Sequence, residues 1–273
     1  MTNHPKWLCI TVGVGSAQYE AAAMRLSKQI EDFEVFDKIQ VVLTAELLEI
    51  CPKLFDWYSK DEILSTKGFG WYAWKSAVAH EALLGRWGDF DGIAYFDSGC
   101  EFFLSRPSRT RLEKYIEEAN TKGTCLFSIP TPENMFTKRD LFKSFPKIHS
   151  EDVSDQFQSG SWFFSKRIAQ EFFPMWNEKV WIGPEQVDES KSVMGERSDF
   201  IVHRHDQSVF SLVAKSLGLQ PIDEYPPGNQ RKKVFYFRAF FYPFWWSRNR
   251  TGQNTIPNLL MLLGKATLLN FKK

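Results

Sequence analysis

The sequence has few cysteines and no pattern that would pair them. The four cysteines among the 273 residues lie far apart and form no CxxC motif. That spacing excludes a zinc ribbon and a disulfide-rich scaffold, and it fits reduced, buried thiols in a cytoplasmic protein. No apolar stretch approaches the roughly 20 residues that a spanning helix needs.

Glycine motifs that bind phosphates are also missing. The chain has no GxxxxGK[ST] loop, and residues 13–15 lack the third glycine of the dinucleotide fingerprint. The histidines form no HExxH pattern. The sequence therefore favours neither a P-loop enzyme, nor an NAD enzyme, nor a zinc protease of that type.

Acidic residues are absent from one end of the chain. Residues 229–273 hold nine Lys and Arg and no Asp or Glu, whereas residues 1–228 hold 25 basic and 33 acidic residues, a net charge of −8. A uniformly basic nucleic-acid binder is excluded. We expect no nucleic-acid partner, because the acidic part would repel phosphates.

Aromatic residues are abundant, at 16% of the chain, and they gather in the basic segment. Residues 234–246 are rich in Phe, Tyr and Trp and are flanked by Arg and Lys, a composition that favours an anionic membrane surface. The alternative is that these aromatics pack back onto the rest of the protein. Residues 226–228, Pro-Pro-Gly, mark the boundary, so we predict one domain over 1–228 and a basic, aromatic C-terminal extension over 229–273.

Short apolar runs alternate with helical patterns along the first 228 residues. Because each run is apolar throughout, the pattern predicts an α/β fold with a mostly parallel sheet buried on both faces. Strands are expected at 8–14, 39–43, 92–96, 124–129 and 161–164, and helices at 16–33, 46–50, 74–84, 107–122, 165–173 and 206–217. Residues 183–199 are expected to form a loop.

Asp97 is the most informative carboxylate. It directly follows the predicted strand 92–96, and Glu101 lies four residues later. Ligands of open α/β sheets bind beyond the carboxyl ends of the strands, and two acids there suit Mg²⁺ or Mn²⁺ on a diphosphate. The alternative is that Asp97 caps a turn and Glu101 is a solvated charge.

Two further segments carry candidate chemistry. Residues 203–208, HRHDQS, place two imidazoles, a guanidinium and a carboxylate at a helix start, where anions are favoured. Residues 68–75, GFGWYAWK, set aromatics and Lys75 behind two glycines, which suits a sugar face and a phosphate. A capped helix and a cluster of core aromatics are the respective alternatives.

Together these segments resemble the GT-A-type glycosyltransferases, which use nucleotide-sugar donors and are built on a single Rossmann-like domain. The resemblance rests on five segments in the expected order, at 68–75, 93–102, 136–142, 158–164 and 203–215. It implies that Asp97 takes the first place of the metal-binding DxD motif. Gly99 stands where the second Asp is expected.

The resemblance also implies roles for individual residues. The catalytic residues would be Asp206, as the base of an inverting enzyme, and His205. The metal, Mn²⁺ or Mg²⁺, would be held by Asp97, Glu101 and His205. The donor, a UDP-sugar before others, would contact Lys75, Trp74, Asp97, Ser98, Lys138, Arg139, Arg204 and Gln207.

The sequence thus predicts a hexosyltransferase-like, nucleotide-sugar-dependent enzyme acting on a glycan or lipid-linked acceptor in surface polysaccharide assembly. We expect it in the cytoplasm, peripheral to the inner face of the membrane through residues 229–273. Two other functions stay open: a non-catalytic glycan-binding module, and a sugar-1-phosphate nucleotidyltransferase.

Overall fold

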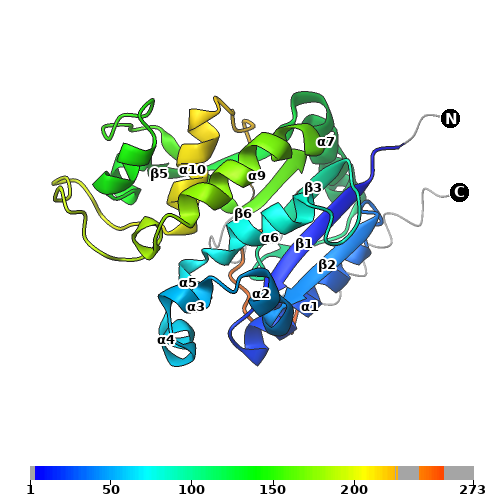
Figure 1. The fold of residues 1–273 in the computed structure, drawn as a ribbon. Coiled ribbons are helices and arrows are strands. Elements are labelled where there is room, and N and C mark those ends of the chain that lie inside the picture. Colours follow the sequence, from blue (N-terminus) through cyan, green and yellow to red (C-terminus); the bar gives the residue numbers. More distant parts are fainter. Residues whose placement is uncertain (1–3, 225, 227–239, 255–273) are drawn as a thin grey trace, which may run out of the picture.

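A five-stranded sheet with the order β2-β1-β3-β6-β5 forms the centre of the protein (Figure 1). The computed structural model describes residues 4–224, 226 and 240–254. β1 pairs in parallel with β2 and β3, while β6 runs antiparallel to β3 and β5, so four strands share one direction. The predicted α/β class with a mostly parallel sheet is confirmed. The strands are β1 (Trp7–Gly13), β2 (Lys38–Leu43), β3 (Gly92–Phe96), β5 (Thr124–Pro132) and β6 (Asp155–Ser165).

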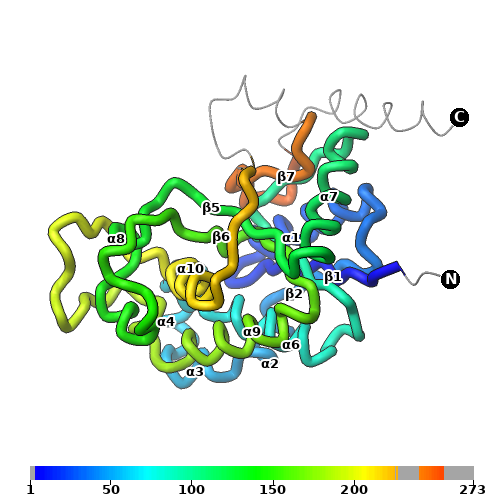
Figure 2. Tube along the Cα trace, turned by 90° about the horizontal axis from the view of Figure 1, so that it is seen from above, coloured from blue at the N-terminus to red at the C-terminus, as the bar shows by residue number. Residues whose placement is uncertain are grey.

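Helices cover both faces of this sheet, as Figures 1 and 2 show. One face is covered by α6 (Trp74–Leu83), α9 (Lys166–Val180) and α10 (Asp206–Ser216), and the other by α1 (Ala17–Glu31) and α7 (Arg106–Lys122). Each face therefore has a hydrophobic core of its own.

Strand β1 contributes side chains to both hydrophobic cores. Its side chains alternate, so Leu8 and Ile10 pack in one core while Trp7 and Cys9 pack in the other. All four are fully buried. The nearly continuous apolar sequence of β1 is thus explained by burial on both faces.

Local capping residues fix where the long helices begin and end. Ser16 accepts a hydrogen bond from the Tyr19 N–H at the start of α1. Ser105 and Ser108 form a reciprocal capping box at the start of α7, which ends at Gly123 in a left-handed conformation.

Shorter elements lie between these helices and strands. None of the helices in the described ranges combines the length and the apolar character that crossing a membrane requires. The short elements are α2 (Thr44–Ile50), α3 (Leu54–Trp57), α4 (Lys60–Ser65), α5 (Gly68–Trp71), β4 (Glu101–Phe102), α8 (Glu133–Phe136), η1 (Arg139–Ser144), η2 (Pro184–Gln186) and β7 (Phe244–Trp245).

Part of the predicted C-terminal extension packs on the domain. β7 pairs antiparallel with β4, and both Phe244 and Trp245 are fully buried. The Phe244 ring lies 4.8 Å from that of Phe96 in the sheet. Around β7, at residues 243–246, the structure thus favours packing over membrane contact (Figure 2). The rest of the extension, residues 229–239 and 255–273, lies outside the described residues, and the predicted boundary at 228 stays a prediction.

The sheet also determines where a ligand can bind. The parallel strands β1 and β3 end at the same edge, and Ser161 of β6 pairs with Phe96 at that edge. The loops that follow β1 and β3, and the first residues of β6, therefore meet there.

Candidate active site

Asp97 lies at this edge, directly after β3. Its side chain is 43% exposed. Oδ1 accepts hydrogen bonds from the Tyr95 hydroxyl and the Lys75 ammonium, each at 2.8 Å. The Asp97 N–H donates to the Gly160 carbonyl at 2.8 Å. The protein thus fixes one carboxylate oxygen and leaves the half-exposed carboxylate accessible to a ligand.

Lys75 lies in the first turn of α6 and joins two carboxylates. Its ammonium lies 2.8 Å from Asp97 Oδ1 and 3.2 Å from Asp206 Oδ2, and its side chain is 4% exposed. Burial by itself would lower the pKa of Lys75, but the charges of Asp206 and Asp97 raise it above its ordinary value. Lys75 is therefore a permanent cation between the two acids.

Asp206 is the buried partner in this group. Its Oδ2 accepts a hydrogen bond from the Ser159 hydroxyl at 2.7 Å and contacts Lys75. Burial raises the pKa of Asp206, while Lys75 and the Ser159 hydrogen bond counteract the rise. A carboxylate with a raised pKa is suited to accepting a proton.

His205 precedes α10 in a strained backbone conformation, with φ at 54°. Its Nδ1 lies 2.7 Å from the Val187 carbonyl and its Nε2 lies 3.1 Å from the Lys67 ammonium. Because a carbonyl only accepts, Nδ1 carries the proton and Nε2 accepts from Lys67. Burial lowers the pKa of His205 to about 4, so the ring is neutral at pH 7. Both nitrogens are occupied, and His205 ties the 183–199 loop to α5.

The segment 68–75 brings aromatic side chains to the same place. Trp71 stacks on His205 with ring centroids 4.8 Å apart, and the Tyr72 ring lies 5.1 Å from the Lys75 ammonium. Phe69, Trp71 and Tyr72 all have positive φ values. Such strain in non-glycine residues concentrates at functional sites.

Glu101 lies away from this group, although the sequence predicts it as a metal ligand. Its fully buried carboxylate accepts a hydrogen bond from Asn249 Nδ2 at 3.0 Å and lies 3.5 Å from the Arg25 guanidinium. Among the residues that the structure describes, no three His, Cys, Asp or Glu side chains gather as a metal site. Asp97, Glu101 and His205 thus do not converge.

Lys138 also lies elsewhere. It is buried, and its ammonium contacts Asp188 Oδ1 and the Ser190 hydroxyl, each at 3.1 Å. It therefore holds the 183–199 loop in place. The prediction of an irregular loop at 183–199 is largely confirmed. Within these described residues, η2 is the one regular element.

Two other predicted donor-binding residues, Trp74 and Gln207, are buried and form hydrogen bonds within the protein. The Trp74 indole N–H donates to the Gly68 carbonyl at 2.9 Å. The Gln207 amide donates to Gln156 Oε1 at 2.8 Å. Both side chains support the site from inside the protein.

The last three predicted residues are Ser98, Arg204 and Arg139. The Ser98 carbonyl accepts a hydrogen bond from Arg25 at 2.7 Å. The Arg204 guanidinium lies 5.8 Å from the centre of the Phe136 ring. Arg139 is half-buried in η1. Of these three, Ser98 is next to Asp97.

Sequence reasoning missed four residues of the site: Tyr95, Ser159, Gly160 and Arg25. An isolated glycine in a strand indicates close approach of another group, so Gly160 carried a signal. Tyr95 lies two residues before Asp97, a spacing that puts two side chains on the same face of a strand, so it carried a local signal too. Ser159 and Arg25 follow only from the pairing of distant segments.

Comparisons with known proteins give a structural likeness only. No profile of a known protein family matches the chain, and no curated protein matches it. Solved structures of glycosyltransferases are similar in overall shape. Mouse xyloside xylosyltransferase 1, in its apo form, matches with a TM-score of 0.44 and 12% identity over 92% of this chain and 100% of that chain.

Two further solved structures are similar to the same degree. The galactosyltransferase LgtC, in complex with donor and acceptor sugar analogs, matches with a TM-score of 0.45 and 11% identity over 87% of this chain and 86% of that chain. The bifunctional glycosyltransferase WbbM, in its apo structure, matches with a TM-score of 0.47 and 8% identity over 90% of this chain and 46% of that chain. Similarity this low assigns no reaction to the chain.

Proposed function

We propose that the protein is a glycosyltransferase of the GT-A type. It would move a hexose from a nucleotide-diphosphate donor, a UDP-sugar before others, to a glycan or lipid-linked acceptor in surface polysaccharide assembly. The observation that carries the proposal is the group of a half-exposed Asp97, a buried Lys75 and a buried Asp206 at the carboxyl edge of the sheet. That edge is where open α/β sheets bind ligands.

In this proposal Asp97 binds the donor. A carboxylate only accepts hydrogen bonds, so its exposed part suits the hydroxyls of a ribose or a sugar. Lys75 and Tyr95 hold Oδ1 from within the protein. The carboxylate is thereby oriented before the donor arrives, which lowers the cost of binding.

Asp206 is the proposed proton acceptor. In transfer with inversion, the bond from the anomeric carbon to the diphosphate breaks, a bond to the acceptor oxygen forms, and the acceptor proton passes to a base. The raised pKa of Asp206 suits that step. If configuration is retained, Asp206 would position the sugar instead.

No step of the proposed reaction involves a divalent metal. Asp97 contributes a half-exposed carboxylate at this edge, but the described residues do not gather the three predicted ligands. The predicted dependence on Mn²⁺ or Mg²⁺ therefore stays a prediction, to be measured directly by adding each metal after treatment with a chelator.

A panel of nucleotide sugars tests the proposal. Purified protein is incubated with each donor, with and without metal, and release of free nucleoside diphosphate is measured. Release from one donor, absent in Asp97→Asn, supports the enzyme. No turnover with any donor and any metal would favour the glycan-binding module. Pyrophosphate release from a nucleoside triphosphate and a sugar 1-phosphate would favour the nucleotidyltransferase.

We also propose a cytoplasmic location with peripheral contact to the inner face of an anionic membrane. The support is compositional, since residues 229–239 and 255–273 are basic and rich in apolar side chains. Co-sedimentation with vesicles tests it: binding should require anionic lipid and should fall with salt. Equal binding to neutral vesicles would contradict it.

A further inference from the structure

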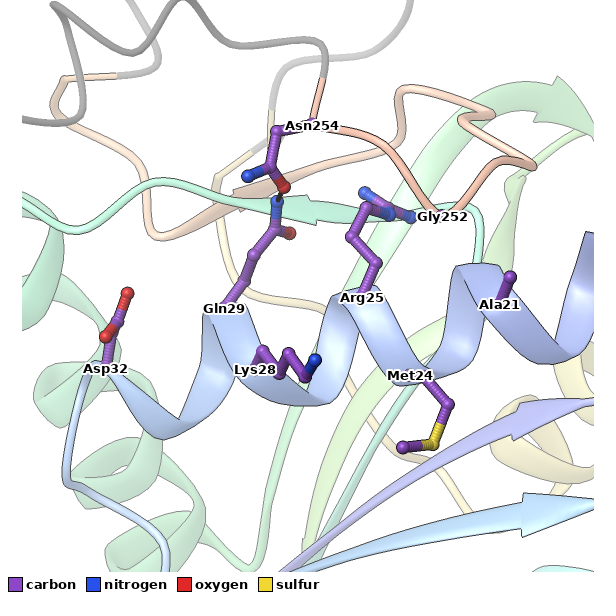
Figure 3. Close-up of a pocket in the computed structure, with 8 residues that line it drawn as sticks. All are labelled: Ala21, Met24, Arg25, Lys28, Gln29, Asp32, Gly252 and Asn254. Atoms are coloured by element: carbon purple, nitrogen blue, oxygen red, sulfur yellow. Dashed lines mark hydrogen bonds between the residues drawn. The ribbon is translucent and has the colours of Figure 1, made fainter.

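The segment 247–254 contacts helix α1 and the loop that follows β3. The Ser247 hydroxyl and the Asn249 N–H both donate to the Gly99 carbonyl, at 2.7 and 3.0 Å. Asn254 accepts a hydrogen bond from Gln29 of α1 at 2.7 Å, as Figure 3 shows. The segment thus connects α1 to the loop that carries Asp97.

Arg248 is held next to Gly99 in this segment. A β-carbon on Gly99 would lie 3.5 Å from the Arg248 Cα, so the two backbones are in close contact. Arg248 has φ at 56°, a left-handed conformation that arginine rarely adopts, yet its side chain is exposed. The buried Arg25 donates to the Asn249 carbonyl at 3.1 Å and fixes the backbone beside it.

Arg250 lies two residues further on and is also exposed. Its guanidinium is 5.7 Å from the centre of the Tyr19 ring, which lies just after the loop that follows β1. Within the described part of the chain, neither Arg248 nor Arg250 forms an ion pair with a carboxylate. Among the described residues, these two positive charges thus have no carboxylate partner.

The donor itself supplies an anionic partner. A nucleoside diphosphate is strongly negative, and Asp97 beside it is negative too, so binding requires cations nearby. Arg248 lies directly against Gly99, two residues after Asp97. Guanidinium groups bind phosphate oxygens through paired hydrogen bonds.

We propose that Arg248 and Arg250 bind the diphosphate of the donor. This inference rests on the proposed function and assigns to two residues of the C-terminal segment a role in the site. The backbone around Arg248 is fixed by hydrogen bonds before the ligand arrives, so binding need not order the backbone.

The test measures binding by calorimetry of UDP, GDP, uridine and guanosine to the full chain. Arg248→Gly removes the guanidinium and suits the left-handed backbone, so its melting temperature should not fall. We expect this variant and Arg250→Ala each to bind the diphosphate at least tenfold more weakly, with nucleoside affinity within about twofold of wild type. Arg109→Ala, on α7, is the matched control and should bind like wild type.

The outcomes separate the two proposals. If wild type binds UDP or GDP and Arg248→Gly binds it equally well, the arginine assignment is wrong and the proposed function stands. If wild type binds neither diphosphate, the proposed function fails and the assignment fails with it. An equal loss for diphosphate and nucleoside would also overturn the assignment, because it would indicate damage to the whole site.

Discussion

A β-carbon on Gly160 would lie 2.4 Å from Oδ2 of Asp97. The carboxylate of Asp97 therefore fits at this position only because residue 160 has no side chain. The same glycine accepts the Asp97 N–H through its carbonyl. Gly160 on β6 and Asp97 after β3 thus form one structural unit at the edge of the sheet.

Gly160→Ala is therefore expected to displace the Asp97 carboxylate. We expect a loss of about 1–3 kcal/mol in the free energy of unfolding, the usual cost of overpacking, and a fall in turnover of at least tenfold. Urea unfolding and release of nucleoside diphosphate measure the two effects. In the Asp97→Ala background the stability loss should shrink, because the clash is gone. If the stability losses of Gly160→Ala and Asp97→Ala were simply additive, the two residues would not be in contact as described.

Asp97→Asn should abolish transfer and keep the fold. The amide has the shape of the carboxylate but lacks its charge, and it leaves Lys75 paired with Asp206 alone. Activity and the melting temperature are measured together. Asp223→Asn, at an exposed position, is the matched control. Near-normal turnover of Asp97→Asn would remove Asp97 from the site.

Lys75→Met should destabilise the protein by about 3–5 kcal/mol, the cost of removing one partner from a buried charge group. Without the ammonium, the carboxylates of Asp97 and Asp206 face each other uncompensated. The pKa of buried Asp206, already raised, should rise further.

This gives the Lys75→Met variant a distinct pH dependence. An acid whose pKa is higher in the folded than in the unfolded state lowers stability by its full amount above the folded pKa. This cost shrinks as the pH falls below the folded pKa toward the unfolded value. The stability gap between variant and wild type should therefore narrow from pH 8 to pH 5, measured by urea unfolding. A gap that is constant with pH would show that repulsion between the two carboxylates is not the cause.

His205 should make wild-type stability fall in acid. Its folded pKa of about 4 lies below an unfolded value near 6.5, so the unfolded chain binds more protons between these values. Its contribution is complete above about pH 6.5 and is lost as the pH falls toward 4. His205→Asn, which suits the positive φ, should flatten this dependence relative to wild type. His203→Asn is measured alongside, because the pKa of His203 is also lowered and its share of the pH dependence must be separated from that of His205. An unchanged pH profile in His205→Asn would contradict the neutral, buried assignment.

Two C-terminal truncations should have opposite effects on folding. Removing residues 240–273 deletes Phe244 and Trp245, each worth about 3–5 kcal/mol when truncated from a core, and should unfold the protein. Removing only 255–273 should leave the circular dichroism spectrum and the cooperative unfolding intact. If the protein without residues 240–273 still folded, β7 would contribute little to the core on the α1 and α7 side of the sheet.

The sequence predicted those elements whose apolar pattern is unbroken. The strand at 92–96 was placed with its observed ends, because its five residues are all buried. β6 was predicted only at 161–164, since Gln156 and Ser159 look polar. They are buried and satisfied by distant groups, as when Gln156 donates to Glu133 at 2.9 Å.

The same reasoning limits what could be foreseen of the site. Asp97 and Asp206 could be predicted because Asp97 directly follows an apolar strand and Asp206 lies at the start of a helix. Arg25 was not, because its partners Ser98 and Asn249 are 73 and 224 residues away in sequence. A pattern with a period of two or 3.6 residues carries no information about such pairs.

The contact between Gly99 and residues 247–249 also has a consequence for synthesis of the chain. The two partners are 148 residues apart, and the loop after β3 leaves the ribosome long before the segment that fastens it. Distant contacts form late and slowly in folding. A nascent chain that has already assembled its sheet would thus still have an unfastened Asp97 loop, and transfer activity would be among the last properties it acquires.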